Sequence, residues 1–202
     1  MSNLGALISG ERINLERISF LLIDDNQQSL DIIGQVVSGF GVRGMHKCQS
    51  VREAKDIASR MDIDFVITNV RFSGEDGFDF LRWLRHVANE PNRYAPAVMV
   101  TGDTSAAVVQ RARDCGAHFV IAKPITPKIL LQRIFWIARE NRLFIDSESY
   151  KGPDRRFKRL GPPPGVTGRR ADDRATKLRD EGGPNLSQDE INAFMKPAKV
   201  NL

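Results

Sequence analysis

The fold is decided by a stretch near the N-terminus, Phe20-Leu21-Leu22-Ile23-Asp24-Asp25-Asn26, in which a short apolar run ends at two adjacent carboxylates. Three later runs have the same form, because each is apolar and leads to a polar side chain. They cover residues 64–69, 97–101 and 119–123, and their polar ends are Asn69, Thr101 and Lys123. Short and almost wholly apolar runs are typical of strands in a parallel sheet that helices cover on both faces.

Segments with the spacing of amphipathic helices lie between these runs. Apolar side chains recur at helical spacing from Leu30 to Val37, and residues 126–141 carry a broad apolar stripe. A weaker strand is expected at residues 42–47. Alternating strands and helices imply right-handed crossovers, with helices on both faces of the sheet. The sequence therefore predicts an α/β fold with a doubly wound, five-stranded parallel sheet.

The polar groups at the strand ends form the candidate site, because ligands of such sheets bind at the carboxyl ends of the strands. Asp24 and Asp25 supply two carboxylates, Thr101 a hydroxyl and Lys123 an ammonium group. This set suits a magnesium-assisted phosphoryl-transfer pocket with the two aspartates as metal ligands. Such a pocket needs an oxygen nucleophile at its centre, and the carboxamide of Asn69 cannot act as one.

Charge is distributed unevenly along the 202 residues, whose net charge is +5. Residues 151–202 hold 12 Lys/Arg and 7 Asp/Glu, which leaves the first 150 residues neutral. Any electrostatic footprint is therefore expected in the tail. No apolar run approaches the length of a membrane span, the start does not have the form of a secretory signal, and the two cysteines form no metal-like pattern. We expect a cytoplasmic protein.

The chain divides into five predicted segments. Gly and Pro become frequent after residue 152, and such a stretch buries too little apolar area to offset its ordering entropy. The segments are an N-terminal extension at 1–16, the α/β domain at 17–146, a basic disordered linker at 147–184, a short amphipathic helical motif at 185–197 and a C-terminal end at 198–202. The fold class is thus one α/β domain followed by a disordered basic tail that ends in a short helix.

The motifs at the strand ends together resemble the receiver domain of two-component response regulators, over roughly residues 17–142. The resemblance implies a flavodoxin-like fold and a signalling role that is not enzymatic. It assigns Asp24 and Asp25 to the acidic pair that holds Mg²⁺, and Thr101 and Lys123 to the hydroxyl and lysine that contact the phosphoryl group. It also implies a cis bond between the lysine and the proline that follows it.

Three positions depart from the pattern of this family. Asn69 stands where the family has its phosphate-accepting aspartate, and Val120 stands at the position of the switch aromatic. Arg71 adds a cation to the loop after Asn69. Our hypothesis is that Arg71 pairs with Asp24 or Asp25 and partly replaces Mg²⁺, so that metal binding is weak or absent; the alternative is that Arg71 points into solvent.

The densest cationic sites of the tail are residues 155–159 and 169–170. The spacing of Arg155 and Arg159 is similar to the arginine pattern with which PilZ-type domains bind cyclic di-GMP, and guanidinium groups suit phosphate and guanine. Arg155, Arg156 and Arg159 are therefore candidate anion or dinucleotide ligands. The alternatives are a solvated linker and nonspecific contact with nucleic acid or anionic membrane. No DNA-reading module follows the domain, so specific DNA binding is not expected.

The last segment contains a capping box, Ser187-Gln188-Asp189-Glu190, before a short apolar helical face. Residues 185–193 are similar to the N-terminal peptide of the flagellar motor switch protein, which docks on a chemotaxis receiver domain. We expect docking through Leu186, Ile191, Phe194 and Met195. The target is either the last helical face of this chain or a separate receiver, and a generic capped helix is the alternative.

Three functions follow, in order of preference. The first is a two-component response regulator that acts as a phosphorylation-independent adaptor through protein–protein contacts, in chemotaxis or motility. The second is a cyclic di-GMP effector that uses the arginine-rich tail. The third is a conventionally phosphorylated regulator, which Asn69 disfavours because an amide is a poor nucleophile.

Overall fold

The computed structural model describes residues 14–139, 143–154 and 185–195. Its centre is a five-stranded parallel sheet of order β2-β1-β3-β4-β5. The strands are β1 (Ser19–Ile23), β2 (Gly44–Cys48), β3 (Phe65–Asn69), β4 (Ala97–Thr101) and β5 (Phe119–Ala122). The prediction of a flavodoxin-like, five-stranded parallel sheet is confirmed.

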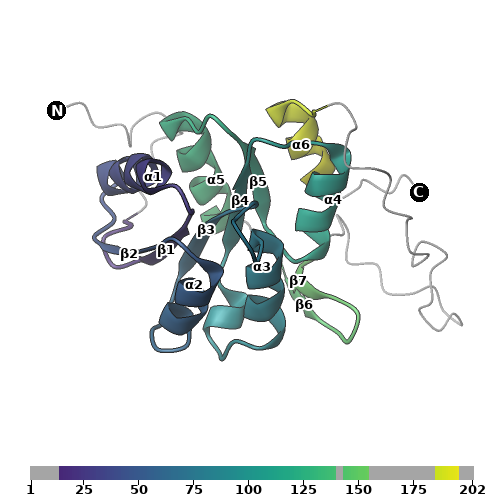
Figure 1. Ribbon diagram of the computed structural model, residues 1–202, viewed down its shortest axis with the longest axis horizontal. Helices are drawn as coiled ribbons and strands as arrows, with labels where there is room; N and C mark the ends of the chain where they lie inside the picture. The colour runs from purple at the N-terminus through teal and green to yellow at the C-terminus, as the bar shows by residue number, and fades with distance from the viewer. Residues whose placement is uncertain (1–13, 140–142, 155–184, 196–202) are drawn as a thin grey trace, which may run out of the picture.

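Helices cover both faces of this sheet (Figure 1). They are α1 (Gln27–Gly39), α2 (Val51–Ala58), α3 (Gly77–His86), α4 (Ala106–Asp114) and α5 (Pro127–Arg139), with a 3-10 turn, η2 (Asn92–Tyr94), before β4. The side chains of Asn26 and Ser50 accept hydrogen bonds from the first turns of α1 and α2. Asp76 and Asp79 form a capping box at the start of α3. These caps satisfy backbone N–H groups that have no partner inside the helix.

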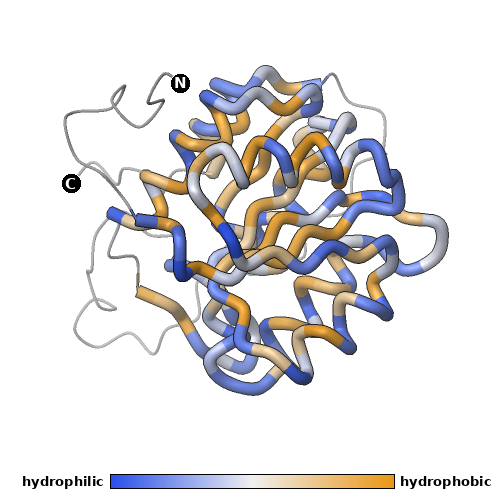
Figure 2. Tube along the Cα trace, turned by 90° about the vertical axis from the view of Figure 1, so that its left-hand side faces the viewer, coloured by the Kyte–Doolittle hydropathy of each residue, from blue (hydrophilic) through white to orange (hydrophobic). Residues whose placement is uncertain are grey.

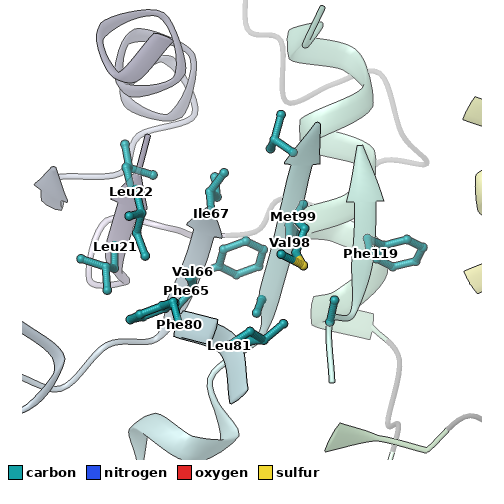
Figure 3. Close-up of a cluster of buried hydrophobic side chains, with 14 of the residues drawn as sticks. Leu21, Leu22, Phe65, Val66, Ile67, Phe80, Leu81, Val98, Met99 and Phe119 are labelled. Carbon is teal, nitrogen blue, oxygen red and sulfur yellow. The ribbon is translucent and has the colours of Figure 1, made fainter. Parts of the chain in front are cut away.

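The hydrophobic core lies between the sheet and the helices. Neighbouring strand residues point to opposite faces, so Leu21 and Leu22 pack into different halves of the core (Figure 3). Phe20 stacks on Phe65 at 4.8 Å between ring centroids. The hydrophobic positions follow the central strands, and polar residues lie mainly on the outside (Figure 2). Burial on both sheet faces explains why the strands are almost wholly apolar.

A two-stranded hairpin follows α5 and packs at the amino end of the sheet. It pairs β6 (Phe144–Asp146) with β7 (Lys151–Pro153) in antiparallel fashion. A side chain on Gly116 would meet the Lys151 carbonyl at 2.5 Å, so this glycine allows the close approach. The buried guanidinium of Arg85 donates hydrogen bonds to the carbonyls of Gly116 and Arg93 and lies over the Phe144 ring.

These contacts make the hairpin part of the folded body. The predicted domain boundary after residue 146 therefore falls inside the hairpin, which extends to Pro153. The physical reason is packing that the local composition does not reveal, since Gly152 and Pro153 are buried. Leu15 also belongs to the core, although the sequence assigned it to an N-terminal extension.

The last described element is helix α6 (Gln188–Met195), which lies beside α4 and β5 (Figure 1). Its first turn has the predicted capping box: Ser187 N donates to Glu190 Oε2 at 2.7 Å, and Glu190 N donates to Ser187 Oγ at 3.3 Å. Strand β5 is an edge of the sheet. The tail segment therefore covers an edge that would otherwise leave backbone groups unpaired.

Candidate functional site

The candidate site lies at the carboxyl edge of the sheet, where four strands end. Asp24 and Asp25 follow β1, Asn69 and Thr101 close β3 and β4, and Lys123 follows β5. Gly77 at the start of α3 permits this packing, because a Cβ there would lie 2.0 Å from the carbonyl oxygen of Asn69. That approach excludes any residue with a side chain. It brings the first turn of α3 directly against the end of β3.

Asp24 is the buried centre of the pocket, with 1% of its surface exposed. Its Oδ2 accepts hydrogen bonds from Lys123 Nζ at 2.9 Å and from Ser29 Oγ at 2.6 Å, and its Oδ1 accepts one from Asn26 N at 3.0 Å. A buried carboxylate requires such partners. The structure thus brings together Asp24 and Lys123 from the predicted set and adds Ser29, which the sequence reading did not identify.

Asn69 points its amide nitrogen toward the acidic pair. Its Nδ2 lies 2.8 Å from the Arg71 carbonyl oxygen, 3.4 Å from Asp24 Oδ1 and 3.5 Å from Asp25 Oδ1. Its Oδ1 accepts a hydrogen bond from the Val70 N–H at 3.0 Å. The amide oxygen is therefore engaged with the backbone, and a neutral donor faces the two carboxylates.

This arrangement does not fit a Mg²⁺ ion. Magnesium needs oxygen ligands in near-octahedral geometry, and the Asn69 atom that faces the carboxylates is a nitrogen donor. The ammonium group of Lys123 also pairs with Asp24. Within the described part of the chain, no group of three or more His, Cys, Asp or Glu side chains is placed to hold a metal ion.

Asp25 is the exposed member of the pair. It borders a shallow pocket of about 240 Å³. The other residues that line this pocket are Gln49, Ser50, Val51, Arg52, Phe72, Ser73 and Glu75. Solvent and solutes therefore reach Asp25 from the side of α2.

Arg71 forms its ion pair with Asp103 in the loop after β4, where Nη2 and Oδ2 are 2.7 Å apart. The hypothesis from the sequence placed the guanidinium on Asp24 or Asp25. The difference arises because Asn69 and Lys123 already contact the acidic pair, while Asp103 lies within reach across the pocket mouth. The hydrogen bond from Arg71 lowers the pKa of the Asp103 carboxyl below its ordinary value.

Thr101 is buried and turned toward the same loop. Its hydroxyl accepts a hydrogen bond from Asp103 N at 3.0 Å and donates one to the Asp103 carbonyl at 3.1 Å. The hydroxyl is thus engaged in shaping the loop, and through Asp103 it is joined to Arg71. Asp103 is a site residue that the sequence analysis missed.

The end of β5 agrees with the resemblance in one respect and departs in another. The peptide bond between Lys123 and Pro124 is cis, as the resemblance implies. Val120 is fully buried, and the ring of Phe119 packs edge-on against Trp136 at 4.5 Å. Neither side chain supplies a mobile aromatic beside Thr101.

The tail segment docks at the end of the sheet next to this pocket. Ile191 and Met195 are buried against the core, and Leu186 and Phe194 are partly buried there. All the apolar residues predicted to dock therefore lie in this interface. The surface they cover is made by β5 and α4, whereas the sequence analysis left open the last helical face of this chain or a separate receiver.

Polar contacts fix the position of the docked segment. The Thr104 hydroxyl donates to the Leu186 carbonyl at 2.7 Å, and Leu186 N donates to the Thr104 carbonyl at 2.9 Å. The Gln188 amide accepts from Ala122 N at 2.8 Å and donates to the Val120 carbonyl at 3.0 Å. One glutamine thus pairs both backbone groups on the free edge of β5.

The remaining predicted residues lie elsewhere. Arg155, Arg156 and Arg159 fall outside the described residues, so their role as anion or dinucleotide ligands stays a prediction. Cys48 and Cys115 are buried free thiols. Burial raises their pKa values to about 12 and about 11, which keeps both as unreactive thiols.

The order of the strands and the acidic pair at the carboxyl end of the sheet are together typical of one class of protein, the flavodoxin-like signalling receivers. The sequence pattern described as "Response regulator receiver domain" matches residues 20–135. Because the match covers more than half of the chain, the protein belongs to the response regulator receiver family. The receiver domain is a signalling module of two-component signal transduction.

Similar proteins come from several signalling systems. Chemotaxis protein CheY-3 of Vibrio cholerae is 24% identical over 61% of this chain and 94% of its own length. Transcriptional regulatory protein GltR of Pseudomonas aeruginosa is 30% identical over 57% of this chain and 47% of its own length. For the sensory/regulatory protein RpfC of Xanthomonas campestris the identity is 25%, over 65% of this chain but only 18% of that protein. The chain thus spans less than half of GltR and RpfC.

Solved structures agree on the fold. Chemotaxis response regulator CheY4 of Vibrio cholerae superposes with a TM-score of 0.54 at 23% identity, over 59% of this chain and 98% of that one. At this level of identity the likeness concerns the fold alone. Among the helices that the structure describes, none is long and apolar enough to span a bilayer.

Proposed function

We propose that this protein is a cytoplasmic response regulator that works as an adaptor without being phosphorylated. The observation that carries the proposal is the amide of Asn69 at the acceptor position, with its nitrogen directed at Asp24 and Asp25. An acyl phosphate forms when a carboxylate oxygen attacks phosphorus. A carboxamide is a poor nucleophile, and the Asn69 oxygen is already bonded to Val70 N.

The pocket instead has the contacts of a structural unit. Lys123 pairs with Asp24, the Asn69 amide bridges the two aspartates to the Arg71 carbonyl, and Arg71 pairs with Asp103. Asp24 and Asp103 thus pair with cations of the protein itself, and the neutral amide of Asn69 faces Asp25. This pattern supports a receiver that rests in one fixed state.

Output through protein–protein contacts is supported by the docked helix. The surface between α4 and β5 binds a short amphipathic segment through buried apolar side chains and directed hydrogen bonds. That segment is similar to the flagellar motor switch peptide, and several of the relatives carry the name of chemotaxis protein CheY. We therefore place the adaptor in a chemotaxis or motility circuit.

In this proposal α6 is the resident occupant of the partner site. A partner with a segment of the same chemistry competes with α6 for the β5 edge. The tether between residues 154 and 185 keeps the local concentration of α6 high, so a weak contact suffices for occupancy. A partner therefore binds only when it displaces α6 or when the tail is held elsewhere.

Treatment with acetyl phosphate and Mg²⁺ tests the absence of phosphorylation. Intact-protein mass spectrometry should show no base-labile phosphoryl adduct on the wild type, while Asn69→Asp should acquire one. The double variant Asn69→Asp/Lys123→Ala is the matched control and should be modified less, because Lys123 points into the pocket. A base-labile adduct on the wild-type receiver domain would overturn the proposal.

A labelled peptide of residues 185–195 tests the partner site. Wild-type protein should bind the peptide weakly because α6 occupies the surface, and Ile191→Asp should bind it more tightly because its own helix is released. Ala193→Asp is the control, since it adds the same charge at an exposed position of α6. Equal affinity for Ile191→Asp and Ala193→Asp would contradict an occupied docking site.

A further inference from the structure

The two polar anchors of the docked tail stand next to two residues of the pocket. Thr104, which bonds Leu186 and Asn185, directly follows Asp103. Ala122, whose N–H is bound by Gln188, directly precedes Lys123. Both anchors are therefore held by loops whose neighbouring residues form ion pairs, Asp103 with Arg71 and Lys123 with Asp24.

Asp103 is held from three directions. Its Oδ2 pairs with Arg71 Nη2 at 2.7 Å, its Oδ1 accepts from Ser105 N at 3.1 Å, and its backbone N–H and carbonyl both contact the Thr101 hydroxyl. These contacts fix the loop on both sides of Thr104. The N–H, carbonyl and hydroxyl of Thr104 can then all face the tail, where they bond to Asn185 and Leu186 at 2.7–3.2 Å.

We infer that Arg71 is a positioning residue for helix α6, which acts through Asp103 to hold Thr104 in the conformation that binds the tail. Without the guanidinium, the Asp103 side chain loses the ion pair that it forms in the described part of the chain, and the loop gains conformations in which Thr104 does not meet Leu186. Arg71 belongs to the loop after Asn69, and in this inference its guanidinium acts on the α6 site through Asp103.

This inference rests on the docked tail and does not depend on whether the receiver accepts phosphate. A phosphoryl adduct on the wild-type protein would contradict the proposed function, but it would not affect the role of Arg71. Conversely, if docking of α6 did not respond to substitution of Arg71, the proposal that Asn69 does not accept phosphate would be unaffected.

Hydrogen–deuterium exchange of the full chain measures the effect. In Arg71→Ala the amides of residues 188–195 should exchange about two- to fivefold faster, as expected for loss of a largely exposed ion pair in a marginally stable element. Arg71→Lys should restore most of the protection. Exchange in β1 reports the integrity of the sheet and should not change in either variant.

Lys55→Ala is the matched control. It removes an ion pair of similar length, 2.9 Å to Glu75, from the same loop between β3 and α3, but one that points toward α2. Exchange in α6 should therefore stay at the wild-type rate. Equal acceleration by Lys55→Ala would mean that loop stability in general, and not the Asp103 contact, controls α6, and it would overturn the inference.

A double-variant cycle and a salt series separate an ion-pair role from a merely structural one. Asp103→Asn should accelerate α6 exchange like Arg71→Ala, and the double variant should add nothing further. Raising the salt concentration from about 0.05 M to about 0.5 M should loosen α6 in the wild type but not in Arg71→Ala. Additive effects, or an equal salt response in both proteins, would overturn the inference.

Discussion

The acidic pocket and the α6 site (the surface of α4 and β5 that binds α6, called the dock below) lie side by side at the carboxyl end of the sheet. They differ in the kind of contact that holds them together. The pocket joins charged and amide groups, several of them exposed to solvent, from the ends of β1, β3, β4 and β5. The dock joins buried apolar side chains with hydrogen bonds to the backbone, at the ends of β4 and β5. In the proposed function the pocket has an amide, Asn69, at the acceptor position, whereas the α6 site has complementary groups on both sides.

The comparison teaches which region can still change state. In the proposed function, the amide of Asn69 offers no carboxylate nucleophile, and its atoms contact Asp24 and the Val70 N–H. At the α6 site, we expect a short helix on a covalent connection to leave and return without covalent chemistry. Control of this receiver is therefore expected to act on the dock, and the following variants test that contrast.

The largest effect is expected for Ile191→Asp. Ile191 is fully buried, so the variant loses apolar burial and places a carboxylate against the core, at a cost of about 3 kcal/mol. Docking of α6 should weaken on the order of 100-fold. Backbone chemical shifts should then change along α4 and β5 while those of β1 stay fixed. Unchanged shifts along α4 would contradict the docked arrangement.

Gln188→Ala should weaken docking about tenfold. It removes the amide that pairs the Val120 carbonyl and the Ala122 N–H, a loss of roughly 1–2 kcal/mol. Gln188→Glu should be no better, because a carboxylate cannot donate to the Val120 carbonyl. Exchange rates of the α6 amides measure both variants. Wild-type protection in Gln188→Glu would show that the donor half of this contact is unimportant.

Asn69→Asp should change the pocket itself, by lowering the stability of the protein and restoring its response to Mg²⁺. A third carboxylate beside Asp24 and Asp25 should lower the stability by about 1 kcal/mol in the absence of divalent cations, through like-charge repulsion. Mg²⁺ should then raise the melting temperature of the variant much more than that of the wild type. Equal Mg²⁺ responses would show that residue 69 does not decide metal binding.

The smallest effect is expected from lowering the pH, which protonates Asp103 and removes its ion pair with Arg71. The pKa of Asp103 is lowered from its ordinary value of 3.8 by Arg71, so the stabilising ion pair is fully present above that value and is lost as the pH falls through the lower folded-state pKa. NMR titration of the Asp103 carboxyl carbon should therefore give a midpoint below 3.8 in the wild type. In Arg71→Ala the midpoint should move up. An unshifted midpoint would argue against the pair in solution.

Much of this architecture could be predicted because each strand, and the polar residue that follows it, is specified by residues that are neighbours in the sequence. Four apolar runs, each leading to a polar residue, determine the parallel sheet and place Asp24, Thr101 and Lys123 on one edge. The capping box at Ser187 likewise gives the start of α6. In both cases a few neighbouring residues carry the whole signal.

The contacts that escaped prediction are long-range ones. Asp103 becomes the partner of Arg71 only because the loops after β3 and β4 meet above the sheet. The hairpin after α5 read as linker because its Gly and Pro residues suit a loop, and its stability comes from the distant Gly116 and Arg85. The contact between Gln188 and the edge of β5 arises only because the two segments lie close together in three dimensions.

The hairpin at the amino end of the sheet sets a length requirement for the tail. The chain leaves the folded body at Asp154, beside β7, and returns at Asn185, at the carboxyl end where α6 docks (Figure 1). The tether must therefore travel the height of the sheet, roughly 15–20 Å for strands of this length. Fully extended residues span about 3.3 Å each, so about six residues are enough for the direct path. Shortening segment 155–184 should be tolerated until near that limit, where α6 would be pulled from its site.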